Sequence, residues 1–136
     1  MRQTIKTVYL GGLRTEATHL QSGSKIITDA PTDNFGKGLA FSPTDLVAKG
    51  LASCMMTTIA IQTRLMGFNL IDSKLTVKKH MSSDPRRISK IEINVFIPKN
   101  DLTEVDKAKI IEIGLSCPVA KSLHPDLIQD INFQFV

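Results

Sequence analysis

Cys54 and Cys117 are the two residues of this chain whose side chains could carry redox chemistry. They do not form a C-x-x-C pair, so the sequence supports neither thioredoxin-like exchange nor the common zinc spacings. The three histidines, His19, His80 and His124, do not stand at metal-ligand spacings, and we expect no metal and no cofactor. On the residues alone, two alternatives stay open: inert thiols in the core, or a redox-active pair.

The two cysteines stand in different local settings. Cys54 lies within the apolar segment of residues 46–66, which predicts a long helix. Cys117 directly precedes Pro118, where a helix is expected to restart after a break. A thiol at that position lies near unpaired backbone N–H groups and the positive end of a helix dipole. Both features favour a thiolate, so this setting favours a reactive Cys117.

Strands and helices in a mixed order must position these cysteines. Residues 4–19 and 25–28 are rich in β-branched side chains and predict an N-terminal hairpin. The long helix should begin after Ser42, a good N-cap, and end near Met66 before Gly67. Further strands are expected at residues 75–78, 88–97 and 131–136, and further helices at residues 101–116 and 119–123. This order predicts one α+β domain over residues 1–136.

The long helix is apolar in almost every direction around its axis. A helix of that kind is normally buried on all sides. One chain of 136 residues has difficulty covering it, because a single layer of sheet covers only one side. The burial argument therefore predicts an obligate homodimer with this helix in the shared core.

Composition and charge narrow the possible functions. The net charge is +4 at pH 7, but the basic residues are scattered, and residues 78–80 and 86–87 flank an expected turn. With no Trp and one Tyr, the chain lacks stacking surfaces for nucleic acid. Polar and basic residues follow Met1, and charged residues interrupt the apolar helix. We therefore expect a cytoplasmic protein with no membrane association.

Two motifs resemble those of the OsmC/Ohr family. Residues 41–48, FSPTDLVA, leading to Ala52-Ser53-Cys54, are similar to the family's long-helix motif. Residues 116–123, SCPVAKSL, are similar to its second cysteine motif, and residues 23–29 resemble its early hairpin. The order of elements agrees along nearly the whole chain. The resemblance implies antiparallel sheets packed on a long buried central helix, in an intertwined homodimer.

The resemblance also implies an activity, a thiol peroxidase that reduces organic hydroperoxides in response to oxidative stress. Carried over to this chain, Cys54 would attack the peroxide and become a sulfenic acid. Cys117 would then condense with it into a disulfide and protect it from over-oxidation. A small or lipoyl-type dithiol would restore the two thiols.

Two helper residues of the family have candidates here. The resemblance implies a Glu on the helix before the cysteine, and an Arg that holds the thiolate. Asp45 is the nearest counterpart of the Glu, and Arg14 is the candidate for the Arg. Each has a plainer interpretation, Asp45 as an acid that caps the helix and Arg14 as a surface residue of a strand.

Helix geometry limits what Asp45 can do. Nine residues separate it from Cys54 on one predicted helix. The two side chains should lie on opposite faces, about 13 Å apart along the axis. Asp45 could therefore assist Cys54 only from a partner chain, or if Gly50 broke the helix, and we favour the partner chain.

Two further hypotheses stand beside the peroxidase. The chain could be a non-catalytic redox sensor of the same fold, or a domain that binds a small apolar ligand. Phe41, Met55, Met56 and Phe68 could line an apolar pocket for a bulky peroxide, or could belong to the core.

Overall fold

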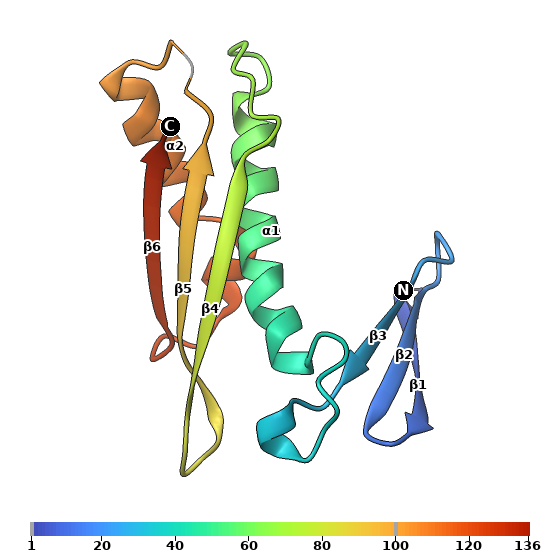
Figure 1. Ribbon diagram of the computed structural model, residues 1–136. Coiled ribbons are helices and arrows are strands. Elements are labelled where there is room, and N and C mark those ends of the chain that lie inside the picture. Colours follow the sequence, from blue (N-terminus) through green and yellow to red (C-terminus); the bar gives the residue numbers. More distant parts are fainter. Residues whose placement is uncertain (1, 100) are drawn as a thin grey trace. The chain divides into compact units, whose positions relative to one another are not determined.

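The computed structural model describes residues 2–99 and 101–136. The chain forms two compact units, Met1–Val47 and Ala48–Val136. Each unit has a three-stranded sheet of its own (Figure 1). The long helix α1 (Pro43–Thr63) begins at the end of the first unit and continues into the second.

The N-terminal unit is built on an antiparallel sheet. Its strands β1 (Ile5–Gly11), β2 (Arg14–His19) and β3 (Lys25–Asp29) lie side by side in chain order. The turn between β1 and β2 has three consecutive residues of positive φ, and two of them are glycines, which adopt this conformation at little cost. The predicted N-terminal hairpin is confirmed, and a short 3-10 helix, η1 (Thr32–Asn34), lies in the following loop.

The apolar side chains of the N-terminal unit are largely uncovered. In the described part of the chain, every buried hydrophobic residue lies at or after Ala48. The strands β1 to β3 instead expose large apolar side chains, among them Ile5, Val8, Tyr9, Leu10 and Ile26. A small sheet needs an apolar face packed on something to be stable. This sheet therefore requires a covering surface.

Local signals start α1 as predicted. The Ser42 hydroxyl accepts the backbone N–H of Asp45 at 3.0 Å, and the Asp45 carboxylate accepts the backbone N–H of Ser42 at 2.9 Å. This reciprocal pair is a capping box. The helix ends at Thr63, earlier than the predicted Met66, and Gly67 follows in a turn with φ of 78°.

The C-terminal unit holds a mixed sheet of strands β4 (Lys74–Ser82), β5 (Arg87–Ile97) and β6 (Ile128–Phe135). β4 and β5 form an antiparallel hairpin, whereas β6 runs parallel to β5. The expectation of antiparallel sheets throughout is wrong for this pair. Parallel neighbours need a long crossover connection, and two helices lie between β5 and β6 along the chain.

The crossover helices are α2 (Glu104–Leu115) and α3 (Pro118–Ser122). The N-cap of α2 is Thr103, whose hydroxyl accepts the backbone N–H of Asp106 at 3.1 Å. The Asp106 carboxylate accepts the backbone N–H of Thr103 in return. α2 therefore begins at Glu104, later than the predicted start at residue 101, and its capping acid is Asp106 at the third helical position.

The core of the C-terminal unit lies between its sheet and its helices. From Ile91 onward, every second residue of β5 is fully buried, namely Ile91, Ile93, Val95 and Ile97. The face of α1 that carries Leu51, Met55 and Ile59 is fully buried with them, together with Ile110 of α2.

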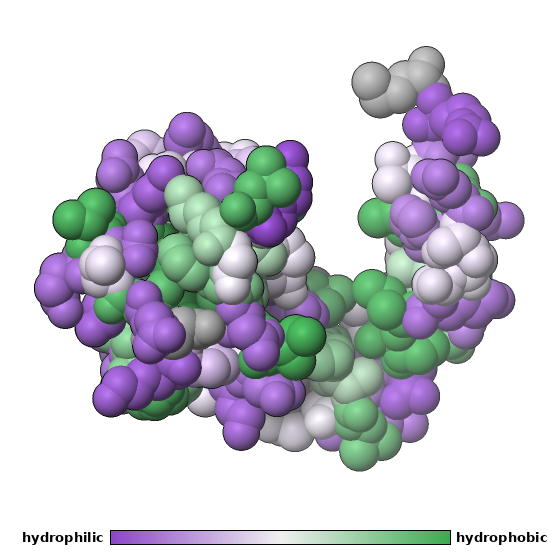
Figure 2. All heavy atoms as spheres, turned by 90° about the horizontal axis from the view of Figure 1, so that it is seen from above, coloured by the Kyte–Doolittle hydropathy of each residue, from purple (hydrophilic) through white to green (hydrophobic). Residues whose placement is uncertain are grey.

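The opposite face of α1 is not covered within one chain. Ile61 is 58% exposed there, and Figure 2 shows hydrophobic side chains at the surface. The expectation of a helix buried on all sides is therefore not met by the single chain, because one sheet covers one face. By length and composition alone α1 could also span a membrane, with a mean hydropathy of 1.2. Core helices meet the same criteria, and the packing of α1 on a sheet leads us to interpret it as one.

Candidate functional site

Cys54 lies near the middle of α1, is partly buried, and packs against the apolar core. Its Sγ is 3.9 Å from the hydroxyl Oγ1 of Thr58, one helical turn further on. A hydroxyl in that place can donate a hydrogen bond to a thiolate. Thr58 is a neighbour that the sequence analysis did not identify.

Cys117 is the N-cap residue of α3 and is fully buried. The backbone N–H of Ala120 donates to its Sγ over 3.5 Å. A sulfur thus stands where the side-chain oxygen of Ser or Asp usually caps a helix. The predicted break is confirmed, since Pro118 is the first residue of the new helix.

The Cys54 side chain lies close enough to Cys117 to affect the pKa of the Cys117 thiol. Burial is the main cause that raises the pKa of the Cys117 thiol, and the neighbouring Cys54 side chain raises it further. The backbone N–H groups of Ala120 and Val119 lower the pKa but do not outweigh burial. The expectation that the helix terminus makes Cys117 a thiolate is therefore wrong. Cys54 is the accessible thiol, and Cys117 is a buried thiol that retains its proton.

A close approach between α2 and α1 brings the two cysteines together. A Cβ atom on Gly114 would lie 3.2 Å from Cγ of Met55, the residue next to Cys54, and 2.9 Å from Cζ of Phe133. Because Gly114 has no side chain, the end of α2 packs directly on α1. Cys117 follows just after this contact.

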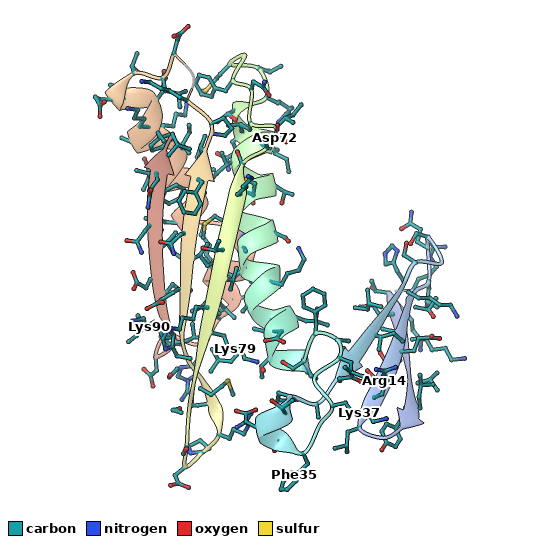
Figure 3. All side chains as sticks on the ribbon, viewed as in Figure 1. Arg14, Phe35, Lys37, Asp72, Lys79 and Lys90 are labelled. Atoms are coloured by element: carbon teal, nitrogen blue, oxygen red, sulfur yellow. The ribbon has the colours of Figure 1, made fainter. Side chains whose placement is uncertain are left out.

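Arg14, the predicted cationic helper, is held by a carboxylate that the sequence analysis did not identify. Its Nε and Nη2 donate to the two carboxylate oxygens of Asp29 at 2.7 and 2.9 Å. Asp29 is 2% exposed and also accepts the backbone N–H of Leu39. Arg14 and Lys37 lie on neighbouring segments of this unit (Figure 3). Hydrogen bonds from Arg14 are the main cause that lowers the pKa of Asp29, and the charge of Lys37 contributes.

The Arg14–Asp29 pair should make folding stability sensitive to acid. The folded pKa of Asp29 lies below its unfolded value, so its contribution is complete above about pH 4 and is lost as pH falls through the folded pKa. We expect Asp29→Asn to be less stable at pH 7 and to lose less stability on acidification than the parent. Thermal unfolding between pH 7 and about pH 2 measures this, with the exposed Asp101→Asn as control. Identical pH profiles for the parent and Asp29→Asn contradict the assignment.

Asp45 serves as the capping acid of α1, which is the plainer of its two interpretations. The helix is continuous through Gly50, so a break there does not bring Asp45 towards Cys54. Arg14, Asp29 and Asp45 belong to the N-terminal unit, whereas both cysteines belong to the C-terminal unit. The structure therefore brings Cys54 and Cys117 together, and pairs Arg14 with Asp29.

Surface hollows occur in both units. In the N-terminal unit, a hollow of about 570 Å³ is lined mostly by apolar residues of β3 and the following loop, Phe41 among them. In the C-terminal unit, a groove of about 370 Å³ lies between α1 and β4 and is lined in part by Met56 and Ser53. Met55 and Phe68 instead belong to the core.

Among residues 2–99 and 101–136, no three His, Cys, Asp or Glu side chains gather as metal ligands.

The fold and the thiols define a class, α+β proteins with an accessible thiol on a core helix beside a buried second thiol. The chain belongs to the OsmC family, because the family model for OsmC-like proteins matches residues 36–129. The matched range includes Asp45 and both cysteines, and leaves Arg14 and Asp29 outside. No protein of curated function is detectably similar to the chain.

Solved structures agree with the family assignment. A Psychrobacter arcticus 273-4 protein, named as a candidate osmotic stress induced and detoxification response protein, is 46% identical, with a TM-score of 0.94 over 98% of this chain and 97% of that one. An OsmC-like protein from Mycoplasma pneumoniae is 18% identical, with a TM-score of 0.81 over 100% and 98%. An organic hydroperoxide resistance protein from Elizabethkingia anophelis, with thiocyanate bound, is 15% identical, with a TM-score of 0.75 over 100% and 99%. The similarities to the Mycoplasma pneumoniae and Elizabethkingia anophelis proteins show only that these chains share the fold.

Proposed function

We propose that this chain is a thiol peroxidase that reduces organic hydroperoxides in the response to oxidative stress. Cys54 is the peroxidatic cysteine and Cys117 the resolving one. The observation that carries the proposal is a partly exposed thiol near a fully buried one, close enough to affect its pKa. The family includes proteins named for organic hydroperoxide resistance, which supports this choice of substrate class.

In the first step, the Cys54 thiolate attacks the terminal oxygen of the hydroperoxide, the one that carries hydrogen. An S–O bond forms as the O–O bond breaks, and the alcohol leaves after taking up a proton. The sulfur is oxidised to a sulfenic acid. Thr58 is placed to donate to the thiolate. We assign to Arg14 the role of the positive charge that holds the Cys54 thiolate in the assembled protein.

In the second step, Cys117 attacks the sulfenic sulfur. An S–S bond forms, the S–O bond breaks, and the proton of Cys117 leaves with the hydroxide as water. An external dithiol, of a small or lipoyl type, then reduces the disulfide by way of a mixed disulfide. The burial of Cys117 suits this role, because a protonated and shielded thiol does not compete with Cys54 for the peroxide.

We propose that the protein acts as a homodimer in the cytoplasm. Two surfaces support the dimer, the uncovered apolar side chains of the N-terminal sheet and the open face of α1 that carries Ile61. A second copy could cover each of them, and each is too apolar to be exposed to water without cost. Two free thiols suit a reducing compartment.

Peroxide consumption with different reductants tests the proposal. We expect turnover of cumene hydroperoxide with dihydrolipoamide or dithiothreitol, and slower turnover with glutathione. A dithiol is favoured because its second thiol resolves the mixed disulfide within one molecule. Absence of consumption with any reductant contradicts the peroxidase. A single oxidation to a stable sulfenic acid, without turnover, would indicate a redox sensor instead.

A further inference from the structure

Gln129 occupies an unusual position at the start of β6. The side chains of residues 129, 131, 133 and 135 share one face of this strand, and the other three are Ile131, Phe133 and Phe135. Gln129 is paired in the sheet with Ile91, which is fully buried and faces the helices. A polar amide in an otherwise apolar row needs a hydrogen-bonding partner, since an unpaired buried amide is costly.

The partner of Gln129 is the helix that carries the resolving cysteine. Its Nε2 donates to the carbonyl oxygen of Ala120 at 2.9 Å. α3 has only five residues, so its last carbonyl groups lack partners within the helix. The N–H of the same Ala120 donates to Sγ of Cys117. One residue is therefore held at both ends, by the sulfur on one side and by Gln129 on the other.

We propose that Gln129 is a positioning residue for the resolving step, acting on Cys117 through Ala120. The inference rests on the proposed function for its chemistry. Gln129 ties α3 to β6, and the Ala120 N–H stays directed at the Cys117 sulfur. The sulfur is then kept beside Cys54, ready to form the S–S bond as hydroxide leaves the Cys54 sulfenic acid and takes the Cys117 proton. Gln129 has no part in the reaction of Cys54 with the peroxide.

Two variants of Gln129 separate this role from a purely structural one. Gln129→Met keeps the length of the side chain and removes the donor. Gln129→Glu keeps the shape, but an ionised carboxylate only accepts hydrogen bonds and repels the Ala120 carbonyl. The matched control is Gln134→Met, on the same strand but exposed and on its opposite face.

Stopped-flow measurements resolve sulfenic acid formation from disulfide formation after one equivalent of cumene hydroperoxide. We expect unchanged sulfenic acid formation in both Gln129 variants. Disulfide formation should slow about tenfold, the change expected when one hydrogen bond is lost. In Gln129→Glu, the rate of disulfide formation should approach that of the parent as pH falls from 7 towards 5, because a protonated carboxyl can donate a hydrogen bond to the Ala120 carbonyl. Gln134→Met should match the parent.

Two kinetic results overturn the inference: resolution at the parental rate in Gln129→Met, or equal slowing of both steps. The thiol oxidant diamide forms the disulfide without any peroxide. It therefore separates a failure of the positioning role of Gln129 from a failure of the peroxidase reaction. If the parent does not react with hydroperoxides, the proposed function fails, and the Gln129 variants are compared by diamide oxidation. If both variants then form the disulfide with diamide at the rate of the parent, the positioning role is overturned as well.

Discussion

Replacing Cys54 by serine should abolish peroxide reduction, whereas replacing Cys117 by serine should leave about one turnover per chain. Serine cannot be oxidised to a sulfenic acid, so Cys54→Ser removes the first step. Cys117→Ser keeps the first step but leaves the sulfenic acid without its buried partner. Further peroxide should then drive Cys54 to sulfinic and sulfonic acids, which dithiols do not reduce.

Peroxide consumption followed by intact mass measurement checks both variants. Cys117→Ser should gain oxygen atoms on one sulfur in proportion to the peroxide added. If Cys117→Ser turns over repeatedly with a dithiol, as fast as the parent, the resolving role of Cys117 is wrong. Parental activity in Cys54→Ser removes the proposed mechanism altogether.

Placing a charge on the open face of α1 should separate the protein into inactive chains. Ile61→Asp puts a carboxylate where we propose that two copies bury their apolar faces, and an unpaired charge is strongly disfavoured in such an interface. The N-terminal sheet would lose its cover as well. We expect sedimentation at micromolar concentration to give twice the chain mass for the parent, and a dissociated or aggregated Ile61→Asp.

The control for this experiment is Val105→Asp. Val105 is 77% exposed near the start of α2, where an acidic residue is favourable. Val105→Asp should keep the mass and the activity of the parent. If the parent sediments as a folded, active monomer, the dimer proposal is wrong. If Ile61→Asp is still dimeric and active, the open face of α1 is not part of the dimer interface.

The dimer also decides how Asp45 could assist catalysis. Because α1 is continuous, Asp45 could assist only a Cys54 on the partner chain. A mixed dimer of Cys54→Ser and Asp45→Ala chains then keeps one intact site, with about half the parental activity. If Asp45 served its own chain, the mixed dimer would show half the activity of the Asp45→Ala homodimer. If Asp45 only caps the helix, Asp45→Ala should lower stability, typically by about 1 kcal/mol.

Features of the fold that depend on local signals were predictable. Ser42 and Asp45 mark the start of α1 because their side chains bond to neighbouring backbone groups. Pro43 marks it as well, because its fixed φ suits the first helical position. Pro118 likewise marks the break after Cys117. The end of α1 and the N-cap of α2 were displaced by a few residues, since helix ends depend on weak competing contacts.

Features that depend on distant residues were not predictable. The parallel pairing of β6 with β5 follows from the crossover through α2 and α3, and nothing local to β6 indicates its direction. The burial that raises the pKa of Cys117 comes from the packing of the C-terminal unit around it. Asp29 was missed because its pairing with Arg14 depends on the register of β2 and β3. A polar residue in the apolar row of β6 was the available signal for Gln129.

Peptide mapping after one equivalent of cumene hydroperoxide tests the central claim most directly. Free thiols are blocked after the reaction, and the cysteine peptides are identified by mass spectrometry. The account predicts one internal disulfide between Cys54 and Cys117 in each chain, which dithiothreitol reverses. Two thiols that are still free, or Cys54 oxidised to an acid beside an unmodified Cys117, would contradict it.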